Sequence, residues 1–343
     1  MSKTANRRRD SVLKIIVSEY IATANPVASE AILRHHSLGV SPATIRNDMA
    51  SLEEEGYISR PYTSSGSVPL DKGYRFYVES LSQNQDLAAE EQKHIRQQLD
   101  TVVDEYDRLF KLAANAMARL VGNAAIVTVP KSPECRYKHL EAVLLHQYMA
   151  MLVLLMSNAV LRRQTINFDT PVTARQLDEA TARLNREYTG LTKKQIAASK
   201  LELSLIEKKL SAAVSDIMCS EDTIEYENSY LEGMRLMLGQ PEFILRDRML
   251  AVLELMEAKG WLKRVVDWQI SDNGVSVIIG EENRDTALRD LSLVMRNYGV
   301  PDLARGAVGI IGPKRMDYRR AIAAVNYISG LLSELVARVC KND

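Results

Sequence analysis

The stretch SPATIRNDMASLEEEG, residues 41–56, carries the clearest signals for local structure in this chain. Ser41 is a residue type that caps the first turn of a helix, and Pro42 fits the first helical position, where its missing N–H costs nothing. Gly56 can adopt the left-handed conformation that ends a helix. Together these residues predict a helix of about four turns.

The predicted helix has an apolar face and a polar face. Ile45, Met49 and Leu52 are spaced i, i+4 and i+7, so they form one face that points into a core. The cap and the N-terminal half of the other faces carry small or polar side chains that suit base edges and phosphates. These candidate DNA-binding residues are Ser41, Ala43, Thr44, Arg46 and Asn47. The alternative is an ordinary solvated helix face, and the neighbouring segments favour DNA contact.

The neighbouring segments complete a small DNA-binding fold. Apolar spacing predicts a helix over residues 10–24, and a second short helix is expected over residues 29–36. After Gly56, extended segments at residues 57–59 and 68–69 flank a turn-rich stretch and predict a hairpin. Three helices and a hairpin are typical of a winged helix-turn-helix, whose third helix enters the major groove while the wing touches the DNA backbone. The wing candidates are Ser64, Ser65 and Gly66.

The distribution of charge favours DNA binding by the N-terminal end. Lys and Arg total 44, as do Asp and Glu, so the chain has no net charge and any affinity for nucleic acid is local. Up to Asn47 the basic residues outnumber Asp10, Glu19 and Glu30. They are Lys3, Arg7, Arg8, Arg9, Lys14, Arg34 and Arg46. The acidic run at residues 53–55 crowds the far end of the third helix, so the N-terminal end of that helix should face the DNA.

Composition excludes several classes of protein. With 343 residues, 46% hydrophobic and 26% charged, the chain should form two or three globular domains. Its three cysteines lie far apart, which argues against a disulfide framework or zinc ribbon and fits a cytoplasmic protein. His35 and His36 lack a spaced Cys or acidic partner, so we expect no metal and no cofactor. Residues 142–161 lack charged side chains, but His146 and Gln147 interrupt them, so we expect a buried strand and no membrane association.

The segment from residue 44 to residue 81 also matches a known family. TIRNDMASLEEEG followed by PYTSSGSVPLDKGYRFYVESL resembles the HrcA family of heat-inducible transcription repressors, which joins a TIRN-type recognition helix to a wing and a G-Y-R-x-Y-V segment. That last segment separates the match from sugar-responsive repressors of the DeoR type. Arg75, which lies in it, is a further DNA-binding candidate, with packing of the wing onto the body as the alternative.

The chain departs from the family's H-T-S-A-G-R-x-P-T wing at Tyr62, Ser65, Ser67 and Leu70. Ser67 replaces an arginine, so we expect a weaker grip on phosphate.

The resemblance implies an α+β fold with three parts. They are a winged-helix domain over residues 1–83, a GAF-like domain over residues 84–170 and 232–343, and a mostly helical dimerising insertion over residues 171–231. Apolar runs predict strands at residues 124–129, 139–146, 149–156, 160–168, 275–280 and 306–311. Helices are expected at residues 86–120, 174–218, 286–298 and 318–339. Within the insertion, the near-heptad stripe Ile196, Leu203, Ile206, Leu210, Ala213 and Ile217 predicts a dimer interface covered by a partner helix.

The resemblance also implies a function. It indicates a homodimeric repressor that binds an inverted repeat in double-stranded DNA, the CIRCE element upstream of chaperone operons, with the GroEL chaperonin as a partner that keeps the repressor active. The alternative is a metabolite-responsive winged-helix repressor whose GAF-like domain binds a small molecule between the strands near Leu144 and Leu154. An enzyme is not expected, because the sequence contains no P-loop, H-E-x-x-H or G-x-S-x-G motif.

Overall fold

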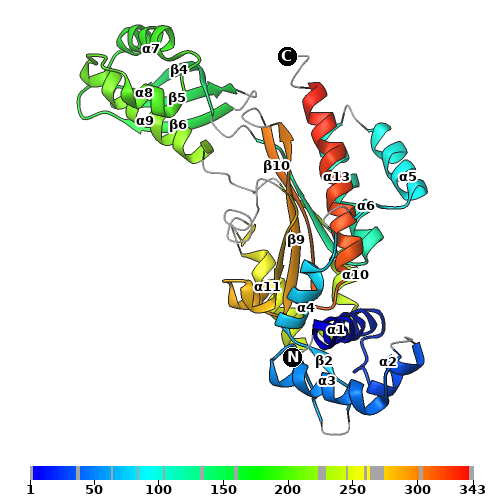
Figure 1. Cartoon of the computed structure of the whole chain (residues 1–343). Helices are drawn as coiled ribbons and strands as arrows, with labels where there is room; N and C mark the ends of the chain where they lie inside the picture. Colours follow the sequence, from blue (N-terminus) through cyan, green and yellow to red (C-terminus); the bar gives the residue numbers. More distant parts are fainter. Residues whose placement is uncertain are drawn as a thin grey trace. The chain divides into compact units, whose positions relative to one another are not determined.

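The computed structural model describes residues 3–35, 39–62, 65–82, 85–102, 105–131, 135–157, 161–222, 229–244, 246–258, 261–262, 274–300 and 304–339 (Figure 1). The chain forms two compact units. The first comprises Met1–Pro130, Tyr226–Gly299 and Gly306–Asp343, and the second comprises Lys131–Glu225 and Val300–Arg305.

The N-terminal part of the first unit is the expected winged helix. Its elements are α1 (Lys3–Thr23), α2 (Ser29–His35), α3 (Pro42–Glu54), β1 (Ile58–Ser59) and β2 (Val68–Pro69). The two strands are antiparallel, with Ile58 opposite Pro69. The inward face predicted for the third helix is confirmed, because Ile45, Met49 and Leu52 are all buried.

The rest of the first unit, here called the sheet domain, is built on five strands in the order β7-β3-β10-β9-β8. The strands are β3 (Ala124–Thr128), β7 (Ser229–Glu232), β8 (Ser276–Ile279), β9 (Leu291–Val300) and β10 (Ala304–Pro313). The helix α4 (Asp71–Glu79), which follows β2, belongs to the winged helix. The helices of the sheet domain are α5 (Ala89–Asp100), α6 (Tyr106–Val121), α10 (Met234–Leu238), α11 (Arg246–Glu257) and α13 (Tyr318–Val339), with short 3-10 turns η2 (Pro241–Phe243), η3 (Gly280–Glu282) and η4 (Thr286–Leu288). Ala124 and Ile126 pack with residues of α10 and α11, while α6 and α13 lie along the sheet on the other side (Figure 1).

The prediction of a helix at residues 286–298 is wrong. Only the short turn η4 forms there, and it is followed by β9, which lies between β10 and β8 in the sheet. Leu291 to Met295 are all buried, because alternate side chains enter the two covered faces of the sheet. Leu293 packs in the α10 and α11 core, whereas Ser292 shares a 2.8 Å hydrogen bond with the Tyr318 hydroxyl. Such a continuous apolar run has no period that distinguishes a strand from a buried helix.

The second unit, here called the inserted unit, contains three antiparallel strands and three helices in its described residues. They are β4 (Tyr137–His146), β5 (Met149–Met156), β6 (Leu161–Asn167), α7 (Ala174–Tyr188), α8 (Lys193–Ala198) and α9 (Leu205–Asp222). The insertion therefore begins at Lys131 and not at residue 171 as expected from the sequence. The sequence shows that these strands exist, but it does not show which sheet they join.

One core holds the inserted unit together, and it corrects two expectations. Ile196, Leu210 and Ile217 are buried in it, and Leu203 and Ile206 pack against its edge. The stripe that we assigned to a dimer interface is thus covered by the unit's own sheet and helices. Leu154 is buried in the same core and Leu144 packs against it, so these strands do not line the ligand pocket that the metabolite hypothesis expected.

None of the helices within the described residues combines the length and apolar character that crossing a bilayer requires. The same residues contain no group of three or more His, Cys, Asp or Glu side chains placed to hold a metal ion.

Candidate nucleic-acid interface

The third helix begins where the sequence indicates. Ser41 has an extended backbone, and its hydroxyl accepts a hydrogen bond from the Thr44 backbone N–H at 3.2 Å. The two hydroxyls also lie 2.9 Å apart. These two candidates therefore fix the N-terminal turn, whose remaining N–H groups and positive dipole end favour phosphate.

One face of α3 is exposed along its length. Ala43, Arg46, Asn47 and Ala50 are all exposed, and their spacing of i, i+3, i+4 and i+7 places them on a single face. The Arg46 side chain is 63% exposed and lies 3.7 Å from Glu30, a surface ion pair that contributes little to stability and is easily exchanged. Arginine and asparagine are the side chains that read guanine and adenine with paired hydrogen bonds in the major groove. Small alanines beside them allow the helix to approach the bases closely.

The basic cluster of the N-terminus has a partly structural role. Arg8 makes two hydrogen bonds, at 2.7 and 2.9 Å, to the buried carboxylate of Asp48 on α3. Arg9 pairs with Glu55 at the other end of that helix. Two of the cations counted in favour of DNA binding therefore anchor α1 to α3, and Arg9 also compensates the acidic end of the recognition helix.

The wing residues predicted to touch DNA mostly shape the turn. The Ser65 hydroxyl accepts from the Tyr62 N–H at 3.0 Å and donates to the Tyr62 carbonyl at 2.8 Å. A Cβ on Gly66 would lie 2.6 Å from the backbone of Pro26, so only glycine allows this approach. Ser64 lies outside the described residues. In the described part of the wing, Tyr62 is 76% exposed, and neither composition nor periodicity singled it out.

Ser67, which stands where the family has an arginine, lies inside the winged helix. Its side chain is fully buried, and its backbone exchanges two 2.9 Å hydrogen bonds with Val27. The hydroxyl has no hydrogen-bond partner in the described structure. Because the serine is buried, it offers no group to phosphate, and the weaker contact of this wing with phosphate stays a prediction.

Arg75 binds protein in this structure. Its Nε donates to Glu282 Oε1 at 2.7 Å, and a terminal nitrogen donates to the Val277 carbonyl at 2.7 Å. Burial lowers the pKa of Arg75, but the carboxylate of Glu282 outweighs this effect and the pKa is raised, so the guanidinium stays charged. The alternative structural role is therefore the one that the geometry supports, and we withdraw Arg75 as a DNA contact.

The same helix makes a second polar contact with the sheet domain. The Asp71 carboxylate accepts from the Glu281 N–H at 2.9 Å and from the Lys314 ammonium group at 2.7 Å. A side chain at Gly280 would collide with Asp71, and the φ of +53° at this position also favours glycine. Helix α4, which carries both Asp71 and Arg75, thus docks the winged helix onto the sheet domain, while the exposed face of α3 takes no part in these contacts.

Comparison with known proteins matches both the N-terminal helix-turn-helix and the C-terminal part of this chain. A family model described as the HrcA protein C-terminal domain matches residues 107–322, and one described as a DeoR-like helix-turn-helix domain matches residues 19–68. A heat-inducible transcription repressor HrcA of Dehalococcoides mccartyi strain 195 is 38% identical over 332 residues, which cover 97% of this chain and 96% of the relative. The protein of the same name from Chloroflexus aggregans is 35% identical over 356 residues, with 99% and 95% covered.

A crystal structure of a hypothetical protein at 2.2 Å resolution has the same fold, with a TM-score of 0.57 and 24% identity over 96% of this chain and 98% of the other. That likeness supports the fold alone. The family assignment rests on the C-terminal model and on the curated relatives, which match this chain almost from end to end. This chain belongs to the HrcA family of heat-inducible transcription repressors.

Proposed function

We propose that this repressor acts as a homodimer on an inverted-repeat operator, the CIRCE element upstream of chaperone operons. The observation that supports it best is the exposed face of α3, where Arg46 and Asn47 stand between two alanines on a capped helix. Two recognition helices related by a two-fold axis read an inverted repeat. The relatives are named as transcription repressors. Their name supports a regulator that binds DNA in the cytoplasm and has no enzymatic activity.

Transcription from a promoter carrying the repeat tests this proposal. The full chain should repress it, and Arg46→Ala should relieve repression at equal protein concentration. Arg175→Ala is a matched control, because Arg175 is an exposed arginine on α7 whose ion pair, with Glu179, lies within its own helix. Equal repression by wild type and Arg46→Ala would contradict the assignment of the recognition face.

We further propose that the GroEL chaperonin maintains the fraction of repressor that can bind DNA. This part rests on the family resemblance. A difference of only a few kcal/mol between active and inactive forms suffices to switch such a population. Titrating the chaperonin with ATP into purified repressor should raise the fraction that binds operator, and an unchanged fraction over the whole titration would refute this role.

The open face of the sheet in the inserted unit supports a second copy of this chain as the dimer partner. One face of the β4-β5-β6 sheet carries the unit's core, whereas the other presents the exposed side chains Val143, Leu145, Met149 and Leu161, with the half-buried Met151, Val153 and Leu155 between them. Contiguous apolar patches of this kind mark interaction surfaces.

Charges on this face favour a two-fold partner. Glu141 and Arg163 lie opposite Val153 on its two sides, one on β4 and one on β6. A two-fold axis parallel to β5 would stack two such faces and set the Glu141 of each protomer against the Arg163 of the other. The same patch then covers itself, as an isologous interface requires.

Light scattering distinguishes this surface from the buried stripe. Val153→Glu should give folded monomers, because the buried charge would face its own copy across the axis. Thr165→Glu, on the same face at the edge strand, should weaken the dimer less. A Val153→Glu variant that remains dimeric would place the interface elsewhere.

A further inference from the structure

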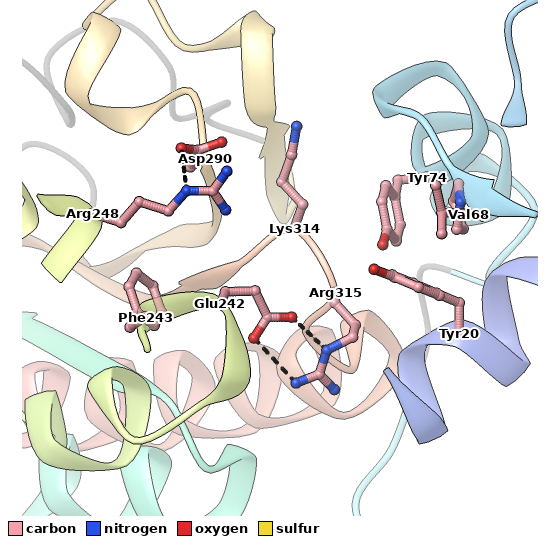
Figure 2. Close-up of a pocket in the computed structure, with 10 residues that line it drawn as sticks. Tyr20, Val68, Tyr74, Glu242, Phe243, Arg248, Asp290, Lys314 and Arg315 are labelled. Carbon is pink, nitrogen blue, oxygen red and sulfur yellow. Dashed lines mark hydrogen bonds and ion pairs between the residues drawn. The ribbon is translucent and has the colours of Figure 1, made fainter. Parts of the chain in front are cut away.

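A cavity of about 160 Å³ lies where α1 and the wing meet the sheet domain, and protein groups balance the charges of its lining (Figure 2). Glu242 pairs with Arg315 at 2.6 Å. Asp290 lies 3.8 Å from Arg248. Lys314 pairs with the Asp71 carboxylate of α4 at 2.7 Å. Each charged group of the lining thus has a partner, and these groups serve the contact between the two domains.

The inserted unit contains two cysteines that the fold brings together. Cys135 precedes β4, and Cys219 lies in the last turn of α9. The Cys135 thiol donates a hydrogen bond to the Met218 carbonyl, with 3.6 Å between sulfur and oxygen. The carbon of this carbonyl is bonded to the Cys219 nitrogen, so the Cys135 sulfur lies within about 6.5 Å of the Cys219 Cα. Two residues that are distant in the sequence are therefore close neighbours in space.

A disulfide between these cysteines needs only a local adjustment. The Cβ atoms of a disulfide are about 3.8 Å apart. Rotation of the exposed Cys219 side chain about χ1 moves its sulfur relative to that of Cys135. The last turn of a helix can also adjust, because its carbonyl groups have no partners within the helix. Side-chain rotation and a shift of this turn are thus sufficient to join the two sulfurs.

The two thiols differ in their access to solvent. Cys219 is exposed, whereas Cys135 is 9% exposed and belongs to the core of the inserted unit. An oxidant in solution therefore reaches Cys219 first, and Cys135 is the thiol beside it that can resolve the oxidised product. We propose that Cys135 and Cys219 form a reversible disulfide when a peroxide oxidises the exposed thiol.

The reaction consumes one peroxide for each disulfide. The Cys219 thiolate attacks one oxygen of hydrogen peroxide, the O–O bond breaks, and the departing hydroxide takes up the proton that the thiol released. The products are water and a sulfenic acid on Cys219. The Cys135 sulfur then attacks the Cys219 sulfur, the S–O bond breaks, and hydroxide leaves as water with the Cys135 proton. The two thiols lose two electrons, which reduce the peroxide to water, and a dithiol restores them by exchange.

The disulfide would fasten the inserted unit near its two ends. The main segment of this unit runs from Lys131 to Glu225, so Cys135 and Cys219 lie just inside its first and last residues. A cross-link that closes a long loop removes conformations from the unfolded chain. The oxidised unit should therefore resist unfolding more than the reduced unit does. This site depends neither on the operator nor on the dimer proposed above.

Oxidation of the full chain with one equivalent of hydrogen peroxide tests the site, followed by thiol titration in denaturant and by digestion without reductant. The chain has three cysteines, and we expect the number of titratable thiols to fall by two. A cross-linked peptide pair should contain Cys135 and Cys219, and dithiothreitol should separate it. Cys219→Ser should form no cross-link within the chain. Cys340→Ser is the matched control and should form the same cross-link as wild type.

Urea unfolding supplies a second readout. Peroxide should raise the urea midpoint of the wild type, dithiothreitol should reverse this shift, and the midpoint of Cys219→Ser should not change. A sulfinic acid on Cys219 without a cross-link, a disulfide between two chains, or a disulfide that uses Cys340 would each overturn the proposal. None of these measurements includes DNA, so loss of operator binding in a separate assay would bear only on the proposed function.

Discussion

The guanidinium of Arg75 and the carboxylate of Glu282, 207 positions apart in sequence, are joined by a hydrogen bond of 2.7 Å between Nε and Oε1. Arg75 belongs to the segment that follows the wing, and Glu282 ends a short turn after β8. This pair, with Asp71 and Lys314 beside it, fixes the winged helix on the sheet domain while the exposed face of α3 stays available.

Removing this pair should loosen the docking without affecting base recognition. Arg75→Ala is expected to cost about 1 kcal/mol of unfolding free energy, because both side chains are partly exposed and water screens the pair. Urea unfolding of the full chain measures this cost. The double variant Arg75→Glu with Glu282→Arg should recover part of it, and binding of Arg75→Ala to an isolated half-site should stay within about twofold of wild type. If Arg75→Ala lost as much affinity for the half-site as Arg46→Ala does, Arg75 would have to be a DNA contact.

Base readout is expected to reside in two side chains of α3. Arg46→Ala and Asn47→Ala should each weaken specific binding by about 1–3 kcal/mol, roughly 5- to 150-fold, because each removes a paired hydrogen bond to a base edge. Both side chains are exposed, so the thermal midpoint should not change. Competition binding against scrambled DNA makes the measurement, and a parallel loss on scrambled DNA would mean that these residues contact only the backbone.

The sequence predicts the structural features that are determined by neighbouring residues, and it does not predict those that depend on residues distant in the chain. The cap at Ser41, the stop at Gly56 and the inward spacing of Ile45 and Met49 are local, and the structure has them as expected. The role of Arg75 is not local, because its partner lies in a turn that no nearby pattern marks. The same limit applies to Leu210, whose heptad spacing is equally compatible with an internal sheet and with a partner helix, and the internal sheet covers it.

The buried hydroxyl of Ser67 should destabilise the wing. Ser67→Ala removes a polar atom that has no partner in the described structure, so the free energy of unfolding should rise by up to about 1 kcal/mol. Chemical denaturation compares the two proteins, with the exposed Ser11→Ala as a control for serine replacement in general. A decrease in stability for Ser67→Ala would indicate that the hydroxyl has a partner after all.

Acid should weaken the inserted unit through Glu207. Burial raises the pKa of this carboxyl, but the Ser204 N–H at 2.7 Å, the Ser204 hydroxyl and Arg183 outweigh it, so the pKa lies below the usual 4.5. A lowered pKa in the folded state stabilises the fold above pH 4.5, and this contribution is lost as the pH falls through the folded pKa. Glu207→Gln should lower the stability at pH 7 and flatten its decline below pH 4.5 in calorimetry. An unchanged pH profile would show that the capping box of α9 does not depend on the charge.

The most direct test of the account is fluorescence anisotropy of the full chain on a duplex carrying the inverted repeat, against a duplex with one half-site scrambled, over a series of salt concentrations. The account predicts tight binding to the intact repeat and a loss of affinity of at least tenfold on scrambling, which persists as salt rises. Equal binding to both duplexes that disappears steeply with salt, and that stays equal after addition of chaperonin and ATP, would contradict a dimeric repressor that reads an inverted repeat.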